Sequence, residues 1–371
     1  MKLKAKGKPA GIQQPVVGKV RRQDVEHCIH ILAKDSLTGV SYQVPVYENE
    51  VQNRVEIPHV HSVGDLNYLS EGDIVVINTD GVINTVYRQE SNHNFFLFTE
   101  RCNSNCLMCS QPPKDRDDTQ YFFELYRDVI PLIPKDCIEL GITGGEPTLL
   151  GEHFFELLKQ LKSELPETEL HCLTNGRSFA WEHMANRLGT IDHKGLMLAV
   201  PLYSDVYYEH DHIVQAKDAF DQTIKGLYNL AAYGQRIEIR IVLHKLTIPR
   251  LVRLARFIYR NLPFVEHVAF MGLEHEGYTP FNIEKLWIDP VDYQVELTEA
   301  ITLLDDMGMN VSLYNIQLCT LSKPLWRFAR KSISDWKNVY FDECQKCSVL
   351  EQCGGMFASA TKKHSDYIIA I

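Results

Sequence analysis

Three cysteines lie within eight consecutive positions of this chain, in the segment CNSNCLMC. They are Cys102, Cys106 and Cys109, separated by three and then by two residues. Thiolates at this close spacing are typical ligands of a zinc ion or an iron–sulfur cluster. Three thiolates are one fewer than a closed zinc site or a fully ligated [4Fe–4S] cluster needs, so one metal position would stay open. An open position indicates chemistry rather than a purely structural metal.

A second candidate ligand-binding segment is GITGGEP, residues 141–147, which ends a predicted strand. Gly144 and Gly145 let the backbone approach a ligand closely and take positive φ values. The carboxylate of Glu146 can accept a hydrogen bond from an ammonium group. A glycine-rich turn alone is often only a turn, and this one lacks the Lys-Ser/Thr pair of a phosphate-binding loop. Its place one strand–helix unit after the cysteines makes it a candidate site.

Four further cysteines near the C-terminus form a second group with the spacing C-x24-C-x2-C-x5-C: Cys319, Cys344, Cys347 and Cys353. Four thiols suit either a structural zinc ion or a complete [4Fe–4S] cluster. The spacing does not separate these two possibilities.

The elements that must position these groups follow two different rhythms. Residues 15–92 predict short strands with turns, including a hairpin at Asp80 and Gly81. From residue 93 onward a strand followed by a helix recurs six times, which predicts a parallel sheet, open or partly closed into a barrel. We therefore expect an α/β fold with function at the carboxyl ends of the strands. The predicted domains are 1–92, a β-rich module; 93–308, the barrel; and 309–371, a cysteine-rich extension.

Composition limits the classes of protein. The chain has 371 residues, of which 45% are hydrophobic, enough to bury a real core. No stretch approaches 18 apolar residues and no secretory signal is visible, so we expect a cytoplasmic protein without a membrane partner. A net charge of −10 argues against a nucleic-acid partner. The lysines at positions 2, 4, 6 and 8 predict a solvated, flexible basic terminus.

The first cysteine group and the GGEP segment resemble the radical S-adenosylmethionine (SAM) superfamily. The resemblance implies a partial (β/α)6 barrel and a [4Fe–4S] cluster on Cys102, Cys106 and Cys109, whose open iron binds SAM. It implies cleavage of SAM to methionine and a 5′-deoxyadenosyl radical, with a low-potential electron donor. The family usually has an aromatic residue before the third cysteine, near the adenine; Met108 stands here, and a polarisable methionine can fill that role.

The resemblance also implies the residues that contact SAM, and none of them is assigned as catalytic. The GGEP segment would hold the methionyl amine of SAM through Gly144, Gly145, Glu146 and Pro147. Thr174 and Asn175 would serve the ribose, and Ser204 would substitute for a serine that the family has where Pro201 stands. Arg240 would pair with the carboxylate of SAM. For Thr174, Asn175, Ser204 and Arg240, an ordinary strand-end hydrogen bond or salt bridge is the alternative.

The C-terminal cysteines resemble the SPASM or shorter twitch extensions of peptide-modifying radical SAM enzymes. This implies an auxiliary [4Fe–4S] cluster, with zinc as the alternative. Including the segment SISDWKN, residues 332–338, the chain is similar to the His-Xaa-Ser system radical SAM maturase of the C type. That family implies modification of a ribosomally made peptide or protein bearing His-Xaa-Ser motifs, alongside a second radical SAM maturase.

Two other functions stay open at this point. One is a non-catalytic, cluster-bearing partner of the second maturase, although a scaffold has no need of an open iron. The other is a radical SAM enzyme that acts on a small molecule. The N-terminal β module would either capture a peptide by adding a strand to an exposed edge or serve as a lid or scaffold for the barrel.

Overall fold

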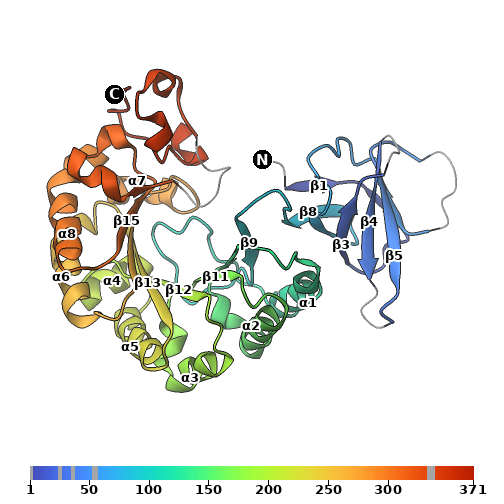
Figure 1. The fold of residues 1–371 in the computed structure, drawn as a ribbon, viewed down its shortest axis with the longest axis horizontal. Helices are drawn as coiled ribbons and strands as arrows, with labels where there is room; N and C mark the ends of the chain where they lie inside the picture. The colour runs from blue at the N-terminus through green and yellow to red at the C-terminus, as the bar shows by residue number, and fades with distance from the viewer. Residues whose placement is uncertain (1–2, 24–26, 35–37, 52–56, 332–338) are drawn as a thin grey trace.

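The computed structural model describes residues 3–23, 27–34, 38–51, 57–331 and 339–371, which form two eight-stranded sheets (Figure 1). The first sheet comprises β1 (Lys4–Lys6), β2 (Lys8–Ala10), β3 (Val16–Arg21), β4 (Cys28–Lys34), β5 (Ser41–Tyr47), β6 (His59–His61), β7 (Ile74–Ile77) and β8 (Val82–Tyr87). Its strand order is β1-β8-β7-β3-β4-β5-β6-β2. The antiparallel pairing of β7 with β8 confirms the hairpin predicted at Asp80 and Gly81.

The two ends of this first sheet are joined by the chain itself. β1 and β2 are the outermost strands, yet only Gly7 separates them in sequence, so the sheet curls until its ends meet. A Cβ atom at Gly7 would lie 2.6 Å from the side chains of Val60 and Val63, so this corner requires glycine. The prediction of a flexible basic terminus is therefore wrong, because Lys4, Lys6 and Lys8 belong to paired strands.

The closed arrangement leaves little edge for strand addition. β5 pairs with β6 only at Val46 and Val60, so the other side of residues 41–45 has no partner strand among the residues that the structure describes. Pro45 lies within that segment and has no N–H to donate. The outer sides of β1 and β2, three residues each, also have no partner strand among the described residues. Capture of a peptide by an added strand and a role as lid or scaffold both stay predictions.

The second sheet is parallel throughout and forms an open, curved wall with its helices on the outside (Figure 1). Its strands are β9 (Asn94–Leu97), β10 (Glu139–Thr143), β11 (Glu169–Leu173), β12 (Leu196–Pro201), β13 (Arg236–Leu243), β14 (His267–Gly272), β15 (Val311–Tyr314) and β16 (Ala329–Arg330). They are ordered as in the sequence. The helices are α1 (Thr119–Val129), α2 (Glu152–Glu164), α3 (Glu182–Ile191), α4 (Tyr207–Val214), α5 (Ala219–Ala232), α6 (Leu251–Asn261), α7 (Ile283–Leu286) and α8 (Gln294–Asp306).

This architecture confirms the predicted fold class. Six strand–helix units are predicted up to residue 308, and the structure adds β15 and β16 beyond that point to the same parallel sheet. The sheet therefore extends past the predicted start of the C-terminal extension, and the domain boundaries themselves stay predictions.

Alternation along each strand separates the core from the inner face of the barrel. On β13, Ile237, Ile239 and Ile241 are buried in the main apolar core, whereas Glu238 and Arg240 face the opposite side. The apolar stripe of α2 packs into the same core, where Leu157 and its neighbours at helical spacing are buried. Each such leucine stabilises the fold by about 1.5–3 kcal/mol through burial.

The N-terminal module packs against the first strand of the barrel. Ile74, Val76 and Tyr87 of the module belong to the same buried cluster as Phe96 of β9. Tyr121 of α1 donates a hydrogen bond to the Asn78 side chain at 3.3 Å. In the part of the chain that the structure describes, no helix has the length and apolar character that crossing a membrane requires.

Candidate functional site

The first cysteine loop leaves β9 and is fixed where it begins. The buried Asp118, just before α1, accepts hydrogen bonds from the Thr99 hydroxyl at 2.5 Å and from the Glu100 N–H at 2.8 Å. On the other side the GGEP backbone donates to the same stretch, from Gly145 to the Thr99 carbonyl at 2.8 Å and from Glu146 to the Arg101 carbonyl at 2.7 Å. The ends of β9 and β10 are thereby joined directly beside Cys102.

The GGEP glycines serve this contact. A Cβ atom on Gly145 would lie 2.1 Å from the Arg101 carbonyl oxygen, and one on Gly144 would lie 2.5 Å from the Thr99 carbonyl oxygen. Both distances are shorter than any real Cβ contact, so only glycine fits. The close approach predicted for these glycines is therefore made to the cysteine loop of the chain itself. Their contact with the amine of SAM stays a prediction.

The far half of the cysteine loop is held by the end of helix α4 and by the segment that follows β14. Asn105 and Leu107 donate from their backbone N–H groups to the carbonyls at the end of α4, each at 3.0 Å. From the segment after β14, Tyr278 donates to the Cys109 carbonyl at 2.8 Å and the Asn282 side chain to the Leu107 carbonyl at 2.9 Å. The loop thus lies across the carboxyl ends of several parallel strands, where sequence analysis expects the site.

The three thiols of this loop are desolvated. Burial raises the pKa of Cys102 to about 11, with the nearby Glu146 carboxylate as the second cause. Burial, and then the sulfurs of Cys109 and Cys102, raises the pKa of Cys106 to about 12. Burial also raises the pKa of Cys109. Thiols that disfavour each other's ionisation need a positive centre before they become thiolates, and a metal cluster supplies that centre as the protons leave.

The geometry of the thiols bears on the kind of metal. Among the described residues, neither cysteine group is arranged as a ready site for a single metal ion. The cysteines of an iron–sulfur cluster bind different irons. Cys102, Cys106 and Cys109, coupled electrostatically on one loop, supply the three ligands that a [4Fe–4S] cluster with one open iron needs.

Glu146 is wholly buried and joins the ends of two strands. Its carboxylate accepts from the Thr148 N–H at 3.0 Å, the Thr148 hydroxyl at 2.7 Å, the Thr174 hydroxyl at 2.8 Å and the Asn175 N–H at 2.7 Å. A carboxylate has about four acceptor positions. These four donors already occupy the acceptor positions of Glu146, and its contact with an ammonium group stays a prediction. In the structure, Glu146 and Thr174 brace the loop.

Asn175 reaches the cysteine loop directly. Its side-chain amide donates to the Asn103 side chain at 2.6 Å and lies 4.0 Å from the Cys102 sulfur. The next residue but one, Arg177, donates to the Asn103 carbonyl and, at 3.1 Å, to the Ser104 hydroxyl. The guanidinium also lowers the pKa of Cys102 and Cys106 as a smaller effect. Arg177 is not predicted from the sequence, although its place in LTNGR at the end of β11 is the signal that could have found it.

Met108 and Ser204 are both buried beneath the loop. Met108 packs in an apolar cluster with Tyr203, Ile213, Val214, Ala219 and Leu286. The Ser204 hydroxyl donates to Glu209 at 2.8 Å and accepts from the Val206 N–H at 3.3 Å, which is a strand-end turn. Ser204 therefore makes ordinary strand-end hydrogen bonds, and its contact with SAM stays a prediction. The role of Met108 beside the adenine of SAM also stays a prediction.

Arg240 lies on the inner face of β13 and uses partners from the protein. Its guanidinium contacts Glu238 at 3.5 Å and the Met271 sulfur at 3.0 Å. Glu238 also contacts His267 at 2.7 Å and His171 at 3.3 Å, and these hydrogen bonds together with Arg240 hold the pKa of Glu238 well below its usual range, against the opposing effect of burial. The salt-bridge alternative for Arg240 is thus observed, and a contact with the carboxylate of SAM stays a prediction.

The second cysteine group converges on one pocket. Cys319, Cys344, Cys347 and Cys353 all line one pocket of about 330 Å³, part of it open to solvent, with Leu318, Tyr340, Val349, Leu350 and Met356 among its apolar walls. Burial raises the pKa of Cys319 and Cys344. Four thiols on one apolar pocket supply the ligands of a fully ligated cluster or of a zinc ion. The segment SISDWKN lies outside the described residues.

Comparison with known proteins identifies the barrel. Residues 96–258 match the family model described as Radical SAM superfamily. No curated protein matches the chain. Among solved structures, SuiB of Streptococcus suis bound to S-adenosylmethionine has a TM-score of 0.51 and 14% identity over 76% of this chain and 76% of its own. The enzyme anSMEcpe with bound AdoMet and Cp18Cys peptide has a TM-score of 0.51 and 14% identity over 74% of this chain and 91% of its own.

A further similar structure is SuiB of Streptococcus suis bound to precursor peptide SuiA, with a TM-score of 0.47 and 15% identity over 60% of this chain. This chain spans 48% of that SuiB chain, about half of its length. At these identities the solved structures show the fold alone. Residues 96–258, somewhat less than half of the chain, thus match a Radical SAM superfamily domain, and this match indicates an enzyme and implies SAM and a [4Fe–4S] cluster as cofactors.

Proposed function

We propose that this protein is a radical SAM enzyme that modifies a ribosomally synthesised peptide or protein. The observation that carries the proposal is the convergence of Cys102, Cys106 and Cys109 on a loop held across the carboxyl ends of the parallel strands. The family match covers this loop. The printed titles of two structures of similar fold, SuiB with precursor peptide SuiA and anSMEcpe with Cp18Cys peptide, favour a peptide as the substrate class.

The roles of this chain's residues follow from their contacts. Cys102, Cys106 and Cys109 would hold the cluster, and Asn175 and Arg177 fix the loop around them. When bound, the cluster and SAM supply one-electron chemistry that ends in removal of a hydrogen atom from the substrate. The buried cluster of Met108 and its neighbours closes the site from below and keeps water away from it. The protein thus supplies orientation and dryness, while the cofactors supply the hard chemistry.

The second cysteine group is proposed to hold an auxiliary [4Fe–4S] cluster, as in the SPASM or twitch extensions. The four thiols that line one apolar pocket support this assignment, and zinc is the competing occupant. An auxiliary cluster could accept the electron that an oxidised product radical must lose, or brace the extension against the barrel.

The finer assignment is the His-Xaa-Ser system maturase of the C type. It is supported by the sequence resemblance alone, and it implies a target with His-Xaa-Ser motifs, a second radical SAM maturase and a low-potential electron donor. The competing function is a non-catalytic, cluster-bearing partner of that second maturase. The intact three-cysteine loop favours an enzyme, because a scaffold needs no open iron.

Two measurements test the proposal. The anaerobically reconstituted full chain is incubated with SAM and dithionite, with and without the second maturase and the target, and 5′-deoxyadenosine is quantified. Formation of this product is expected; its absence under every condition supports the non-catalytic partner instead. Mass spectrometry of a co-expressed His-Xaa-Ser target then tests the substrate. A product that is changed in mass, or in residue configuration on digestion, is expected, and an unaltered target contradicts that assignment.

A further inference from the structure

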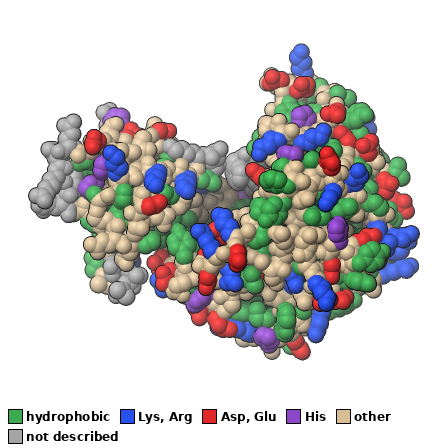
Figure 2. All heavy atoms as spheres, turned by 180° about the vertical axis from the view of Figure 1, so that it is seen from behind, with side chains coloured by type: hydrophobic (Ala, Val, Ile, Leu, Met, Phe, Trp, Pro, Cys, Tyr) green, Lys and Arg blue, Asp and Glu red, His purple; other side chains and the backbone are tan. Residues whose placement is uncertain are grey.

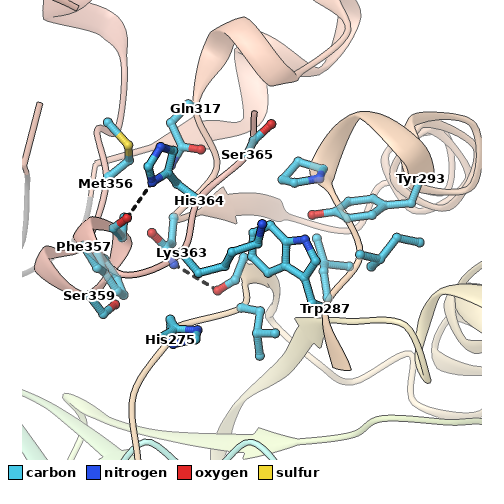
Figure 3. A pocket seen from close by; sticks show the side chains of 17 residues that line it. His275, Trp287, Tyr293, Gln317, Met356, Phe357, Ser359, Lys363, His364 and Ser365 are labelled. Atoms are coloured by element: carbon cyan, nitrogen blue, oxygen red, sulfur yellow. Dashed lines mark hydrogen bonds between the residues drawn. The ribbon is translucent and has the colours of Figure 1, made fainter. Parts of the chain in front are cut away.

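A cavity lies where the C-terminal extension meets the barrel (Figure 3). It encloses about 480 Å³, part of it open to solvent. On the barrel side it is bounded by Leu243, Gly272 and Asn315, which lie at the carboxyl ends of β13, β14 and β15. Ligand sites of parallel α/β sheets gather at these ends. No motif of the sequence points to this cavity.

The cavity lies between the two cysteine groups. It shares Gln317 and Met356 with the pocket that holds the four C-terminal cysteines. Its residue His275 belongs to the loop that follows β14, and three positions later Tyr278 donates to the Cys109 carbonyl at 2.8 Å. The cavity therefore adjoins the pocket of the C-terminal cysteines, and the loop that forms one of its sides continues into a direct contact with the first cysteine loop.

One wall carries a positive charge without a counterion. The Lys363 ammonium lies 4.9 Å from the centre of the Trp287 ring, and neither Lys363 nor its neighbour Lys362 has an ion pair with a described carboxylate. Asp289, which precedes the cavity residue Pro290, accepts from the Ser365 hydroxyl at 2.7 Å. In a chain with a net charge of −10, an unneutralised lysine on a cavity wall is notable.

A polar group on the barrel side of the cavity lacks a partner among the described residues. The Nδ1 atom of His275 is buried and makes no hydrogen bond with any described residue. Burial, and then Lys362 and Lys363, lowers the pKa of His275, so the ring is neutral and can present one N–H. Buried polar atoms are nearly always hydrogen-bonded in native proteins, and one that is not calls for a ligand or an ion. His275 and Lys363 line the same cavity from opposite sides of the interface (Figure 3).

We propose that this cavity binds a carboxylate group of the peptide substrate. Lys363 supplies the positive charge, His275 donates a hydrogen bond, and the Trp287 ring packs against the carbon atoms next to the carboxylate. The ligand is an acidic side chain or a C-terminal carboxylate, which share this chemistry. The inference rests on the proposed function, since it assigns the carboxylate to the substrate.

Three synthetic peptides test the site against the full, anaerobically reconstituted chain. They are acetyl-Ala-Ala-Asp-Ala-Ala-amide, its Asn counterpart as the amide, and the Asn counterpart with a free C-terminal carboxylate. Binding is followed by calorimetry and by the fluorescence of Trp287, identified with Trp287→Phe. We expect one or both carboxylate peptides to bind at least about tenfold more tightly than the neutral one, and the preferred peptide identifies the source. Equal binding of all three peptides overturns the proposal.

Matched variants separate a site from general charge. Lys363→Gln is expected to abolish the preference, and Lys363→Arg to keep most of it. Lys362→Gln removes the same charge one position away, from a lysine that does not line the cavity, and is expected to keep the preference. An equal loss in Lys362→Gln and Lys363→Gln contradicts a defined site.

The outcome is distinguishable from that of the proposed function. Lys362→Gln, whose side chain does not line the cavity, should form 5′-deoxyadenosine as the wild-type chain does. Product formation by the wild-type chain without any preference for carboxylate peptides overturns this inference alone. Retention of the preference without product formation overturns the proposed function alone.

Discussion

The carboxylate of Glu146 shows how single residues hold the candidate site. It is completely buried, and four donors from the ends of β10 and β11 converge on it. Burial alone raises the pKa of Glu146, and the four hydrogen bonds oppose this effect. The sequence predicts Glu146 as a hydrogen-bond acceptor but does not predict its partners. Thr174 and Asn175 lie nearly thirty positions away and meet Glu146 only in the folded sheet.

Glu146→Gln is therefore expected to destabilise the protein. A glutamine presents an N–H group to donors that need an acceptor, and an unsatisfied buried donor costs about 1–3 kcal/mol. Urea unfolding measures this loss. Glu152→Gln is the matched control, because Glu152 is exposed and pairs with Arg187 at the surface; it should change the free energy of unfolding by less than about 1 kcal/mol. Equal effects of the two substitutions would contradict the bracing role.

His244 gives the protein a specific dependence on acid pH. The side chain is wholly buried, its Nδ1 accepts from the Leu246 N–H at 3.2 Å, and burial lowers the pKa of His244 to about 3. Because the unfolded side chain takes up a proton near pH 6.5 while the folded one does not, stability is complete above pH 6.5. It falls as the pH drops from about 6.5 to 3, by about 1.4 kcal/mol per pH unit for this residue.

Urea unfolding at pH 7 and pH 5 checks this expectation. His244→Asn keeps an acceptor for the Leu246 N–H but cannot titrate, so its loss of stability between the two pH values should be smaller than that of the wild type. His210, whose pKa burial lowers to about 3 in the same way, is unchanged in both proteins. Identical losses would show that His244 is accessible to protons in the folded state.

At the scale of elements, the cysteine loop is positioned by strand ends rather than by its own sequence. The GGEP segment, the end of α4 and the segment after β14 each bond to it. The spacing of the cysteines and the glycine pair were visible in the sequence, as were the strand–helix units that carry them. The roles of Arg177 and Gly277 were not visible in the sequence, because Arg177 contacts Asn103 and Gly277 lies against Cys109, more than seventy residues away in each case. Local patterns do not encode such contacts.

Gly145→Ala tests this element directly. The added Cβ would lie 2.1 Å from the Arg101 carbonyl oxygen, so the GGEP segment and the cysteine loop must separate. We expect severalfold less iron bound by the first cysteine group after reconstitution, and a loss of about 1–3 kcal/mol in stability. Ser110→Ala, at an exposed position of the same loop, should keep the iron of the wild type. Full iron content in Gly145→Ala would show that the close approach is dispensable.

At the scale of the whole molecule, a closed β module, an open parallel barrel and a cysteine-rich extension follow one another along the chain (Figure 1). Seen from behind, a notch opens between the β module and the C-terminal extension, and charges of both signs are spread over that face (Figure 2). The parallel sheet was predictable because each strand is followed by its helix. The closure of the β module could not be predicted, since β1 and β2 are three residues each and pair with strands about fifty or more residues away.

The two cysteine groups should load independently. If both hold [4Fe–4S] clusters, the reconstituted chain contains about eight iron atoms. Cys344→Ala should remove about four of them and leave the first cluster in place, and Cys106→Ala should do the converse. Cys137→Ala, outside both groups, serves as the control. Elemental analysis that finds about four iron atoms and one zinc ion in the wild type would assign zinc to the C-terminal group.

The central claim is that the metal held by Cys102, Cys106 and Cys109 keeps one position open for SAM. Electron paramagnetic resonance of the dithionite-reduced Cys344→Ala chain, with and without SAM labelled in its methionyl amine and carboxylate, tests this most directly. We expect a signal that changes when SAM is added and that shows hyperfine coupling to the label. The signal should be lost in a variant that also carries Cys106→Ala. A signal that SAM leaves unchanged would contradict the claim.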